Sequence, residues 1–245
     1  MKKIGILYDN ISGNTGDLAI GLSVKKILRD LEIEYDELTI GQFSPLDYTT
    51  ILIGGGHLLR SSPDYIYDKF KVHGNHILNT VGIVGNPLDL SYLEEYIYVS
   101  VRSNGDKAKL PYLQKDVHVV PCTSLLLEDL PDLKCPIKTP SIGIHLFPIF
   151  KSAEEEQRFV TWANSLPFSI YFIPITHYNQ DINFMNRLSA RIKNSQLLPI
   201  MNPLEIFTLI GKFDYFISCS LHGGYFSYAH NNPFLLYNYN DKMAF

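Results

Sequence analysis

The sequence lacks the features that mark disulfide-linked, nucleic-acid-binding and membrane-spanning proteins. Its three cysteines, Cys122, Cys135 and Cys219, form no CxxC pair, so we expect reduced thiols in a cytosolic protein. The net charge is −4, from 21 basic and 25 acidic residues, and no basic block stands out, which argues against a nucleic-acid partner. No apolar run approaches the ~18 residues of a membrane span.

The short motifs of several common enzyme classes are missing as well. There is no GxGxxG and no P-loop, so a dinucleotide or Walker-type site is unsupported. There is no GxSxG, and no HxH or HExxH spacing accompanies His145 or His177, so we predict neither a metal nor a cofactor. The N-terminal MKKIGILYDN has too few apolar residues before Tyr8 for a signal peptide, and it predicts a first strand instead.

What the sequence does contain is enough apolar material for a sizeable core, with 46% hydrophobic and 19% charged residues over 245 positions. In the first half, short apolar segments alternate with helical patterns and glycine-rich or polar turns, as in a doubly wound domain. Helices are predicted over Gly16–Leu31 and Leu88–Tyr96. The predicted strands are Lys2–Tyr8, Glu32–Ile40, Tyr48–Ile53, His76–Val84, Ile97–Val101 and Val117–Val120.

A proline-bearing stretch, Leu125–Pro140, is the candidate linker, and a second alternating β/α set follows it. We therefore predict an α/β protein of two doubly wound Rossmann-like domains, residues 1–130 and 131–245, with a cleft between them that would take the substrate. The predicted strands here are Ser141–Phe147, Phe168–Ile173, Gln196–Met201, Phe213–Ile217 and Phe234–Tyr239. The predicted helices run from Ser152 to Leu166, Asp181 to Lys193, Pro203 to Ile210 and Leu221 to His230.

The most informative stretch is the strand, tight turn and helix around His222. The apolar run Phe213–Ile217 gives way to small polar residues, which places His222 in the first turn of the helix with Ser220 as its N-cap. In parallel sheets, ligands bind outside the carboxyl ends of the strands, where such turns lie. The alternatives stay open: His222 as a surface or capping residue, and Gly223 and Gly224 as packing glycines rather than openings for a ligand.

Three other turns follow predicted strands. The turn from Asn14 to Asp17, with Gly16 between them, offers N–H groups to an anion or a sugar hydroxyl, or is simply an N-capped helix start. The glycines Gly54, Gly55 and Gly56 let a ligand approach the backbone, although a glycine-rich turn alone is a weak signal. Arg102 could grip a carboxylate or phosphate, or be an ordinary surface arginine.

The order of these turns and strand ends along the chain, together with several further short segments, resembles the polysaccharide pyruvyl transferase family. The resemblance extends over most of the chain. The C-terminal stretch, including Glu205 and Asp214, is the most specific part of the resemblance. The matching segments are Asn14–Ile20, Ile53–Leu59, Val99–Arg102, Val119–Pro121, Ser220–His222, Asn232–Pro233 and Tyr239–Lys242.

The resemblance implies a GT-B-like fold and transfer of a pyruvyl group from phosphoenolpyruvate to two sugar hydroxyls, which forms a ketal. It implies His222 as general acid/base, Arg102 and Lys242 as donor-binding cations, and the turns at Asn14–Asp17 and Gly54–Gly56 as cleft lining. The implied acceptor is a surface polysaccharide or its precursor, either a free or a lipid-linked glycan. The implied location is the cytoplasm, with the inner face of the membrane as an alternative.

The sequence departs from the family pattern at three places. Ser220 stands where the family usually has arginine before Leu-His, Ser103 stands where members often have aspartate, and the sequence ends at Phe245, where many relatives continue. The loss of the arginine removes one expected anchor for an anionic donor. Two rival hypotheses therefore remain: a GT-B-like glycosyltransferase that uses a sugar nucleotide, and a non-catalytic glycan-binding relative.

Overall fold

The computed structural model describes residues 3–60, 66–86, 89–176 and 180–237. Contacts divide this part of the chain into two compact units. The first unit holds residues 3–12 and 17–124, and the second holds residues 13–16 and 125–237. Leu125, where the second unit resumes, is the first residue of the predicted linker.

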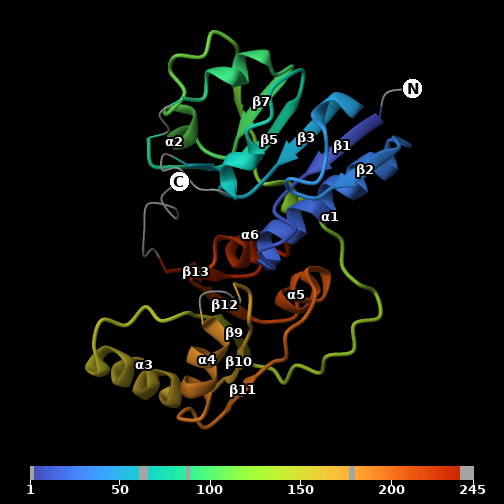
Figure 1. Ribbon diagram of the computed structural model, residues 1–245. Helices are drawn as coiled ribbons and strands as arrows, with labels where there is room; N and C mark the ends of the chain where they lie inside the picture. Colours follow the sequence, from blue (N-terminus) through green and yellow to red (C-terminus); the bar gives the residue numbers. More distant parts are fainter. Residues whose placement is uncertain (1–2, 61–65, 87–88, 177–179, 238–245) are drawn as a thin grey trace. The chain divides into compact units, whose positions relative to one another are not determined.

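The first unit is built on a six-stranded parallel sheet with the strand order β2-β1-β3-β5-β7-β8. From β1 the chain moves outward to β2 and then returns to the other side of β1, so the order reverses between β1 and β3, which are neighbours in Figure 1. Two short strands, β4 (Leu59–Arg60) and β6 (Ile83–Val84), form a separate parallel pair. The main strands are β1 (Lys3–Leu7), β2 (Tyr35–Leu38), β3 (Tyr48–Gly54), β5 (Ile77–Val81), β7 (Tyr98–Val101) and β8 (Val117–Val119).

Side chains from α1 (Thr15–Asp30) cover one face of this sheet, and irregular segments cover the other. Val24 and Leu28 of α1 pack with Ile6 and Tyr8 of the first strand and its end. Val24 and Leu28 are four positions apart, so they lie on the same face of the helix. The opposite face buries a larger apolar cluster, which includes Leu7, Ile53, Leu78, Val99, Phe70 and Tyr96.

The second unit carries a five-stranded parallel sheet in the order β11-β10-β9-β12-β13. Here the order reverses between β9 (Ser141–His145) and β12 (Tyr215–Ser218), so the carboxyl ends of these two strands meet at the switch point. The remaining strands are β10 (Ser169–Phe172), β11 (Ser195–Leu197) and β13 (Phe234–Leu236). His145 ends one of the two switch-point strands, and the turn before His222 follows the other.

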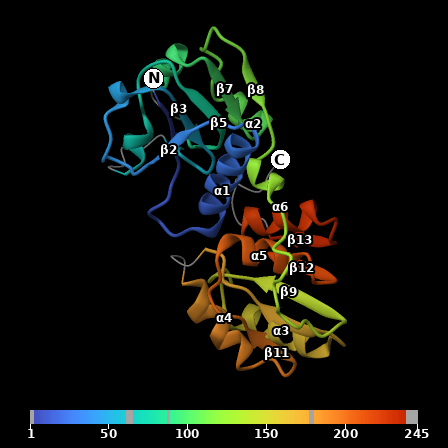
Figure 2. The ribbon, with the colours of Figure 1, turned by 90° about the vertical axis from the view of Figure 1, so that its right-hand side faces the viewer.

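Helices cover both faces of this second sheet, as a doubly wound domain requires. In Figure 2, α3 (Ala153–Ser165) and α4 (Asp181–Ser189) lie on one side of the sheet, and α5 (Pro203–Ile210) and α6 (Leu221–Ala229) on the other. The first pair buries Val160 and Met185 against the sheet. The second pair meets through the edge-to-face rings of Phe207 and Phe226, 5.3 Å apart.

The predicted helix caps are largely confirmed. The Asn202 side chain accepts hydrogen bonds from the N–H groups of Leu204 and Glu205, each at 3.0 Å, and the Glu205 carboxylate accepts from Asn202 N at 2.8 Å. These bonds form a reciprocal capping box at the start of α5. At α3, Ser152 accepts from Glu155 N as predicted, but the Glu155 carboxylate bonds Lys151 N instead of the cap residue.

Two predictions for the first half are wrong. The predicted helix Leu88–Tyr96 is a short 3-10 helix, Ser91–Glu95, because the Asp89 carboxylate caps Ser91 in a tight turn and Tyr96 is tied to Val72 O. The predicted strand His76–Val84 is two strands, β5 and β6. Thr80 takes a φ of 50° and Gly82 N bonds Gly56 O, so the chain leaves the main sheet between them.

Three predictions for the second half need correction. The strand predicted to begin at Phe234 is the short β13, which ends at Leu236 and forms the edge of its sheet, with Phe234 41% and Leu235 57% exposed. An apolar run alone cannot distinguish a central strand from an edge strand. The predicted helix Asp181–Lys193 ends at Ser189, and the predicted strand Gln196–Met201 is the shorter β11. Within the described residues, no helix is both long and apolar enough to cross a bilayer.

Candidate functional site

The His222 turn at the start of α6 is held by a serine from the strand before it. Ser218 Oγ accepts from Ser220 N at 2.8 Å and donates to the Ser220 carbonyl at 3.0 Å. Ser220 occupies the N-cap position that the sequence predicted, but its side chain makes no capping hydrogen bond. The strand's own side chain therefore shapes the turn that presents His222.

Packing accounts for the two glycines after His222. A Cβ at Gly223 would overlap Ser218 Oγ, and a Cβ at Gly224 would lie 2.7 Å from Leu236 of β13. Neither position therefore has room for a side chain. The structure supports the packing explanation for this glycine pair over the idea that it opens the backbone to a ligand.

His222 itself is 7% exposed and lies among aromatic rings. Its imidazole meets Tyr225 edge-on at 5.8 Å and Phe226 at 6.2 Å between ring centroids. Gly16, which belongs to the second unit by its contacts, lies against the same imidazole, and a Cβ there would overlap it. The structure thus brings together His222 and Gly16, two residues that the sequence singled out separately.

The neighbouring Asn14 takes the structural role that the sequence left open. Its side-chain oxygen accepts from Gly16 N at 2.9 Å at the start of α1. This is the bond of a helix-starting turn. Asp17 stands in the first helical turn, where a carboxylate complements the helix dipole.

A second buried polar group lies at the carboxyl ends of β9 and β10. His145 is fully buried, and its Nδ1 donates to Ile173 O at 3.0 Å, so the proton resides on Nδ1. Asp181 Oδ2 lies 3.8 Å from the same nitrogen. The Asp181 carboxylate accepts from Ile175 N, Thr176 N and Ile182 N at 2.8–3.0 Å, which satisfies it without solvent.

Two of the cysteines lie at strand ends, but neither is placed as a nucleophile. Burial raises the pKa of the Cys219 thiol to about 12, so at neutral pH it is protonated beside the His222 turn. Burial also raises the pKa of Cys122. A thiol nucleophile reacts as its thiolate, so thiol chemistry is not the function of either position.

In the first unit, Arg102 follows β7 and is 9% exposed, so it is not the surface arginine that position alone allowed. Its Nη2 contacts His57 Nε2. Gly82 lies under both side chains, and a Cβ there would overlap His57 and come 2.5 Å from Arg102 Nη2. Ser103, next in the chain, caps the short helix α2 (Asn104–Lys107) by accepting from Asp106 N at 3.0 Å.

The glycine turn after β3 is shaped by α1. Gly55 and Gly56 both have a φ of 69°, a conformation that favours glycine. A Cβ at Gly55 would overlap Ile20, and one at Gly56 would overlap Asp17 Oδ1. Gly54 ends the strand beside Asn79. Close approach of α1 therefore requires these glycines, whether or not a ligand also uses the turn.

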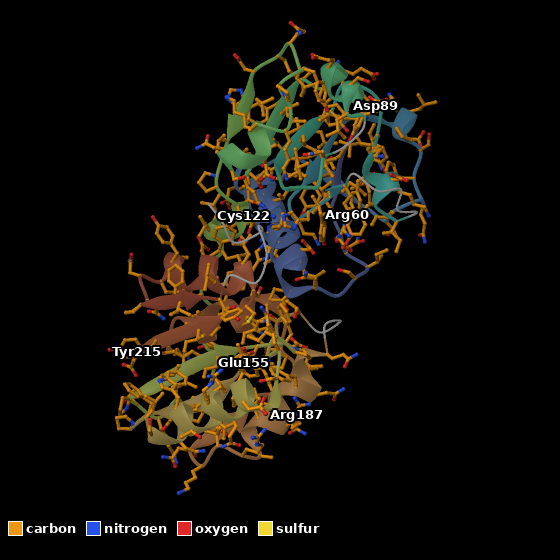
Figure 3. All side chains as sticks on the ribbon, turned by 90° about the vertical axis from the view of Figure 1, so that its left-hand side faces the viewer. Arg60, Asp89, Cys122, Glu155, Arg187 and Tyr215 are labelled. Atoms are coloured by element: carbon orange, nitrogen blue, oxygen red, sulfur yellow. The ribbon has the colours of Figure 1, made fainter. Side chains whose placement is uncertain are left out.

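The second unit also has an apolar hollow of about 350 Å³, at the amino ends of its strands. Tyr215, which begins β12 and is labelled in Figure 3, is one wall, and Trp162 and Phe234 are others. The lining is almost entirely carbon, so it offers little to a sugar hydroxyl or a phosphate. The carboxyl ends of the strands remain the better candidate site.

Comparison with known proteins identifies the family to which the chain belongs. The model of a family described as polysaccharide pyruvyl transferase matches residues 14–241. The chain belongs to the polysaccharide pyruvyl transferase family. The resemblance inferred from the ordered motifs is thereby confirmed. No curated protein sequence matches the chain.

Solved structures support the fold of this family member. A Klebsiella pneumoniae protein of uncharacterised function is 15% identical, with a TM-score of 0.57 over 97% of this chain and 84% of that one. A UDP-GlcNAc 2-epimerase from Neisseria meningitidis, bound to UDP-GlcNAc, is also 15% identical, with a TM-score of 0.51 over 96% and 82%. The corresponding epimerase from Methanocaldococcus jannaschii gives 10% identity and 0.52 over 98% and 84%. The predicted class of two Rossmann-like, GT-B-like domains is confirmed.

The roles predicted for individual residues of this pyruvyl transferase family member stay predictions. Lys242 lies outside the described residues. His222 and the Gly54–Gly56 turn belong to different units, and a cleft shared by them also stays a prediction. Among the described residues, no three His, Cys, Asp or Glu side chains are grouped to hold a metal ion. The sequence reasoning missed the contact of His57 with Arg102, although His57 directly follows the glycine turn.

Proposed function

We propose that this chain transfers a pyruvyl group from phosphoenolpyruvate to two hydroxyls of a sugar, forming a ketal on a surface polysaccharide or its precursor. The observation that carries the proposal is the family match over residues 14–241, nearly the whole chain. The acceptor is a glycan, free or lipid-linked, and the location is the cytoplasm or the inner face of the membrane. No cofactor enters the reaction.

The reaction needs a proton donor and acceptor. The enol carbon of phosphoenolpyruvate takes a proton, a sugar hydroxyl adds to the adjacent carbon, and a second hydroxyl then replaces phosphate at that carbon. Each hydroxyl loses its proton as it adds. His222 is the proposed acid/base, because an imidazole exchanges a proton near neutral pH and His222 stands at a helix start beyond a strand end.

The reaction also needs cations for a carboxylate and a phosphate. Arg102 is the proposed donor-binding cation, because its guanidinium is always charged and can hold two oxygens at once. Its burial against His57 holds it at the end of β7. Lys242 is the second cation that the resemblance implies.

The serine at position 220 is the observation that favours the two rival hypotheses over pyruvyl transfer. It is 6% exposed and carries no charge where the family usually has arginine. Under the first rival hypothesis the chain is a glycosyltransferase that uses a sugar nucleotide; under the second it binds a glycan without catalysis. Fold similarity to an epimerase that was solved with UDP-GlcNAc does not decide between them, because fold does not determine function.

The deciding experiment follows phosphate release and product mass. The purified chain is incubated with phosphoenolpyruvate and a panel of sugar acceptors, and we expect acceptor-dependent phosphate release together with a product that carries the ketal. The His222→Gln variant is assayed in parallel, and we expect it to release phosphate more slowly. Thermal shift separates the rivals: phosphoenolpyruvate stabilises the pyruvyl transferase, a sugar nucleotide stabilises the glycosyltransferase, and neither stabilises the glycan-binding relative.

A further inference from the structure

The contact between Arg102 and His57 places a guanidinium against one nitrogen of an imidazole ring. Arg102 Nη2 faces His57 Nε2. A guanidinium has only N–H donors and stays protonated, so the nitrogen it faces must be the acceptor. His57 is therefore neutral here, and its ring proton resides on Nδ1.

An anion that binds Arg102 would change this arrangement. Its oxygens would draw the guanidinium N–H groups away from His57 Nε2, because charge-assisted bonds to an anion are stronger than a bond to a neutral ring. The released Nε2 could then take a proton and donate it to the same anion. Imidazole is the side chain that makes this change near neutral pH.

The charges around His57 favour an anion at this place. Arg60 Nε donates to the His57 carbonyl at 3.3 Å, and Lys109 Nζ donates to the Ile83 carbonyl at 2.7 Å, one residue beyond Gly82. Figure 3 labels Arg60 in the same unit. With Arg102, three cations therefore border the turn.

Two carboxylates lie at the same edge. The Asp106 carboxylate is engaged by Ile83 N at 2.8 Å and by Ser103 Oγ at 2.6 Å. Asp17 of α1 abuts Gly56. The Cys122 thiol, also labelled in Figure 3, is neutral: burial raises its pKa, and the hydrogen bonds of Ser124 and then the charge of Arg102 oppose this more weakly. Among these groups, an imidazole is the kind of side chain whose charge ordinarily changes near neutral pH.

A strained residue on β5 is a second, independent observation at this edge. Thr80 is fully buried and has a φ of 50°, a conformation that β-branched residues rarely adopt. Its Oγ1 has no hydrogen-bond partner among the described residues, while its N–H is held by Ser100 Oγ of β7 at 2.9 Å. Strained backbone conformations cluster at ligand and switch sites, and a buried hydroxyl without a partner calls for an explanation.

We propose that Arg102 and His57 form an anion site in the first unit, at which His57 takes up a proton as the anion binds. The pair then presents two positive charges to a phosphate or carboxylate. That the anion is phosphoenolpyruvate rests on the proposed function, whereas the site itself can be tested without it.

Sulfate is the probe, because it is a dianion throughout the neutral range and any proton taken up belongs to the protein. Calorimetry on the full chain in two buffers of different ionisation enthalpy should show uptake of up to about one proton per sulfate. Affinity should weaken by up to about tenfold per pH unit as the pH rises through the neutral range. His57→Gln should abolish both effects and bind sulfate about tenfold more weakly at slightly acidic pH.

The matched control is His118→Gln, since His118 is an exposed histidine of the same unit, stacked on Tyr98. It should leave proton uptake and affinity unchanged. Absence of proton uptake by the wild-type chain, uptake that persists in His57→Gln, or no sulfate binding at millimolar concentration each overturns the proposal. If His57→Gln does not fold, His57→Asn replaces it, and the wild-type proton count decides without any variant.

Competition separates this proposal from the proposed function. If phosphoenolpyruvate competes with sulfate for the chain, the anion site is the donor site. If sulfate binds with proton uptake but phosphoenolpyruvate does not compete, the anion site stands and the donor assignment fails. If phosphoenolpyruvate is turned over while sulfate binding needs no proton at His57, the proposed function stands and this proposal fails.

Discussion

Ser218 Oγ both accepts from Ser220 N and donates to Ser220 O, so a single hydroxyl from β12 closes the turn that presents His222. The serine is fully buried, and its Oγ would touch any side chain placed at Gly223. The sequence Ser-Cys-Ser-Leu-His-Gly-Gly thus encodes a rigid platform for the histidine. This platform can be tested apart from the chemistry.

Ser218→Ala should lower stability, because Ser220 N loses its partner in a buried turn and Ser220 O keeps only the 3.4 Å bond from Gly224 N. Leaving buried backbone groups unpaired costs about 1–3 kcal/mol. Urea unfolding of the variant and of Ser165→Ala would measure this loss. The Ser165 hydroxyl also bonds a backbone carbonyl but lies at the exposed end of α3, where a change below about 0.5 kcal/mol is expected. Equal stability of the two variants would show that the Ser218 bonds add nothing.

His222→Gln should lower turnover by about 10²–10⁴, the usual contribution of a positioned acid/base group. Glutamine keeps the size and hydrogen-bonding capacity of the side chain but cannot exchange a proton near neutral pH. The Michaelis constant for phosphoenolpyruvate should change little if His222 acts in the chemical step. Circular dichroism would first show that the variant is folded, and steady-state kinetics would then measure its turnover. Near-wild-type turnover would mean that His222 only packs in the core.

Asp181→Asn should destabilise the second unit by about 3 kcal/mol or more. The Asp181 carboxylate accepts from three backbone N–H groups and lies beside His145, so an amide nitrogen would face donors with nothing to receive. Urea unfolding would show the loss. Asp132→Asn, at an exposed position, is the control and should stay within about 0.5 kcal/mol of wild type.

Glu156 of α3 predicts a pH effect on stability. Hydrogen bonding and charge from Arg187 of α4 lower its pKa, with a further contribution from Arg191, just beyond the end of α4, so both arginines are tied to α3. A lowered folded-state pKa gives stability that is present above the unfolded value and is lost as pH falls through the folded value. The loss should be small, about 0.5–1 kcal/mol, because Arg187 is largely exposed. Unfolding at neutral and acidic pH should show a smaller drop for Glu156→Gln than for wild type.

The features that the sequence predicted best are helix starts, because their capping residues are close together in the chain. The Asn202-Pro203-Glu205 cap of α5 lies within four positions, so both partners of each bond were visible together. The start of α6 at Ser220 was predictable for the same reason. Errors arose where distant contacts decide: Tyr96 bonds Val72 O and prevents a longer helix, and Gly56 O draws Gly82 out of the main sheet.

The candidate site shows the same limit. His222 and Arg102 could be selected because each follows a strand, a relation that is written in the sequence. The contact between Arg102 and His57 joins residues 45 positions apart, and no periodicity reveals it. The only local signal was the position of His57 directly after the glycine turn, where a side chain at the carboxyl edge of the sheet is expected.

Ser220→Arg tests the departure from the family pattern. A donor with a carboxylate and a phosphate needs more positive charge than one guanidinium supplies, and a helix start offers only about half a charge. An arginine at position 220 would add charge-assisted hydrogen bonds worth ~1.5–3 kcal/mol, which is about a ten- to hundredfold gain in affinity for phosphoenolpyruvate. Calorimetry on folded wild type and variant would measure it.

Ser220→Gln separates charge from bulk in that experiment, because glutamine extends the side chain without adding charge. Ser220 is 6% exposed, so both variants meet similar crowding, and any difference between them reports the charge. We expect tighter binding for arginine alone. If wild type and Ser220→Arg both ignore phosphoenolpyruvate at millimolar concentration while they remain folded, the pyruvyl transfer hypothesis fails. A sugar nucleotide or a glycan then becomes the ligand to test, because neither depends on an arginine at this position.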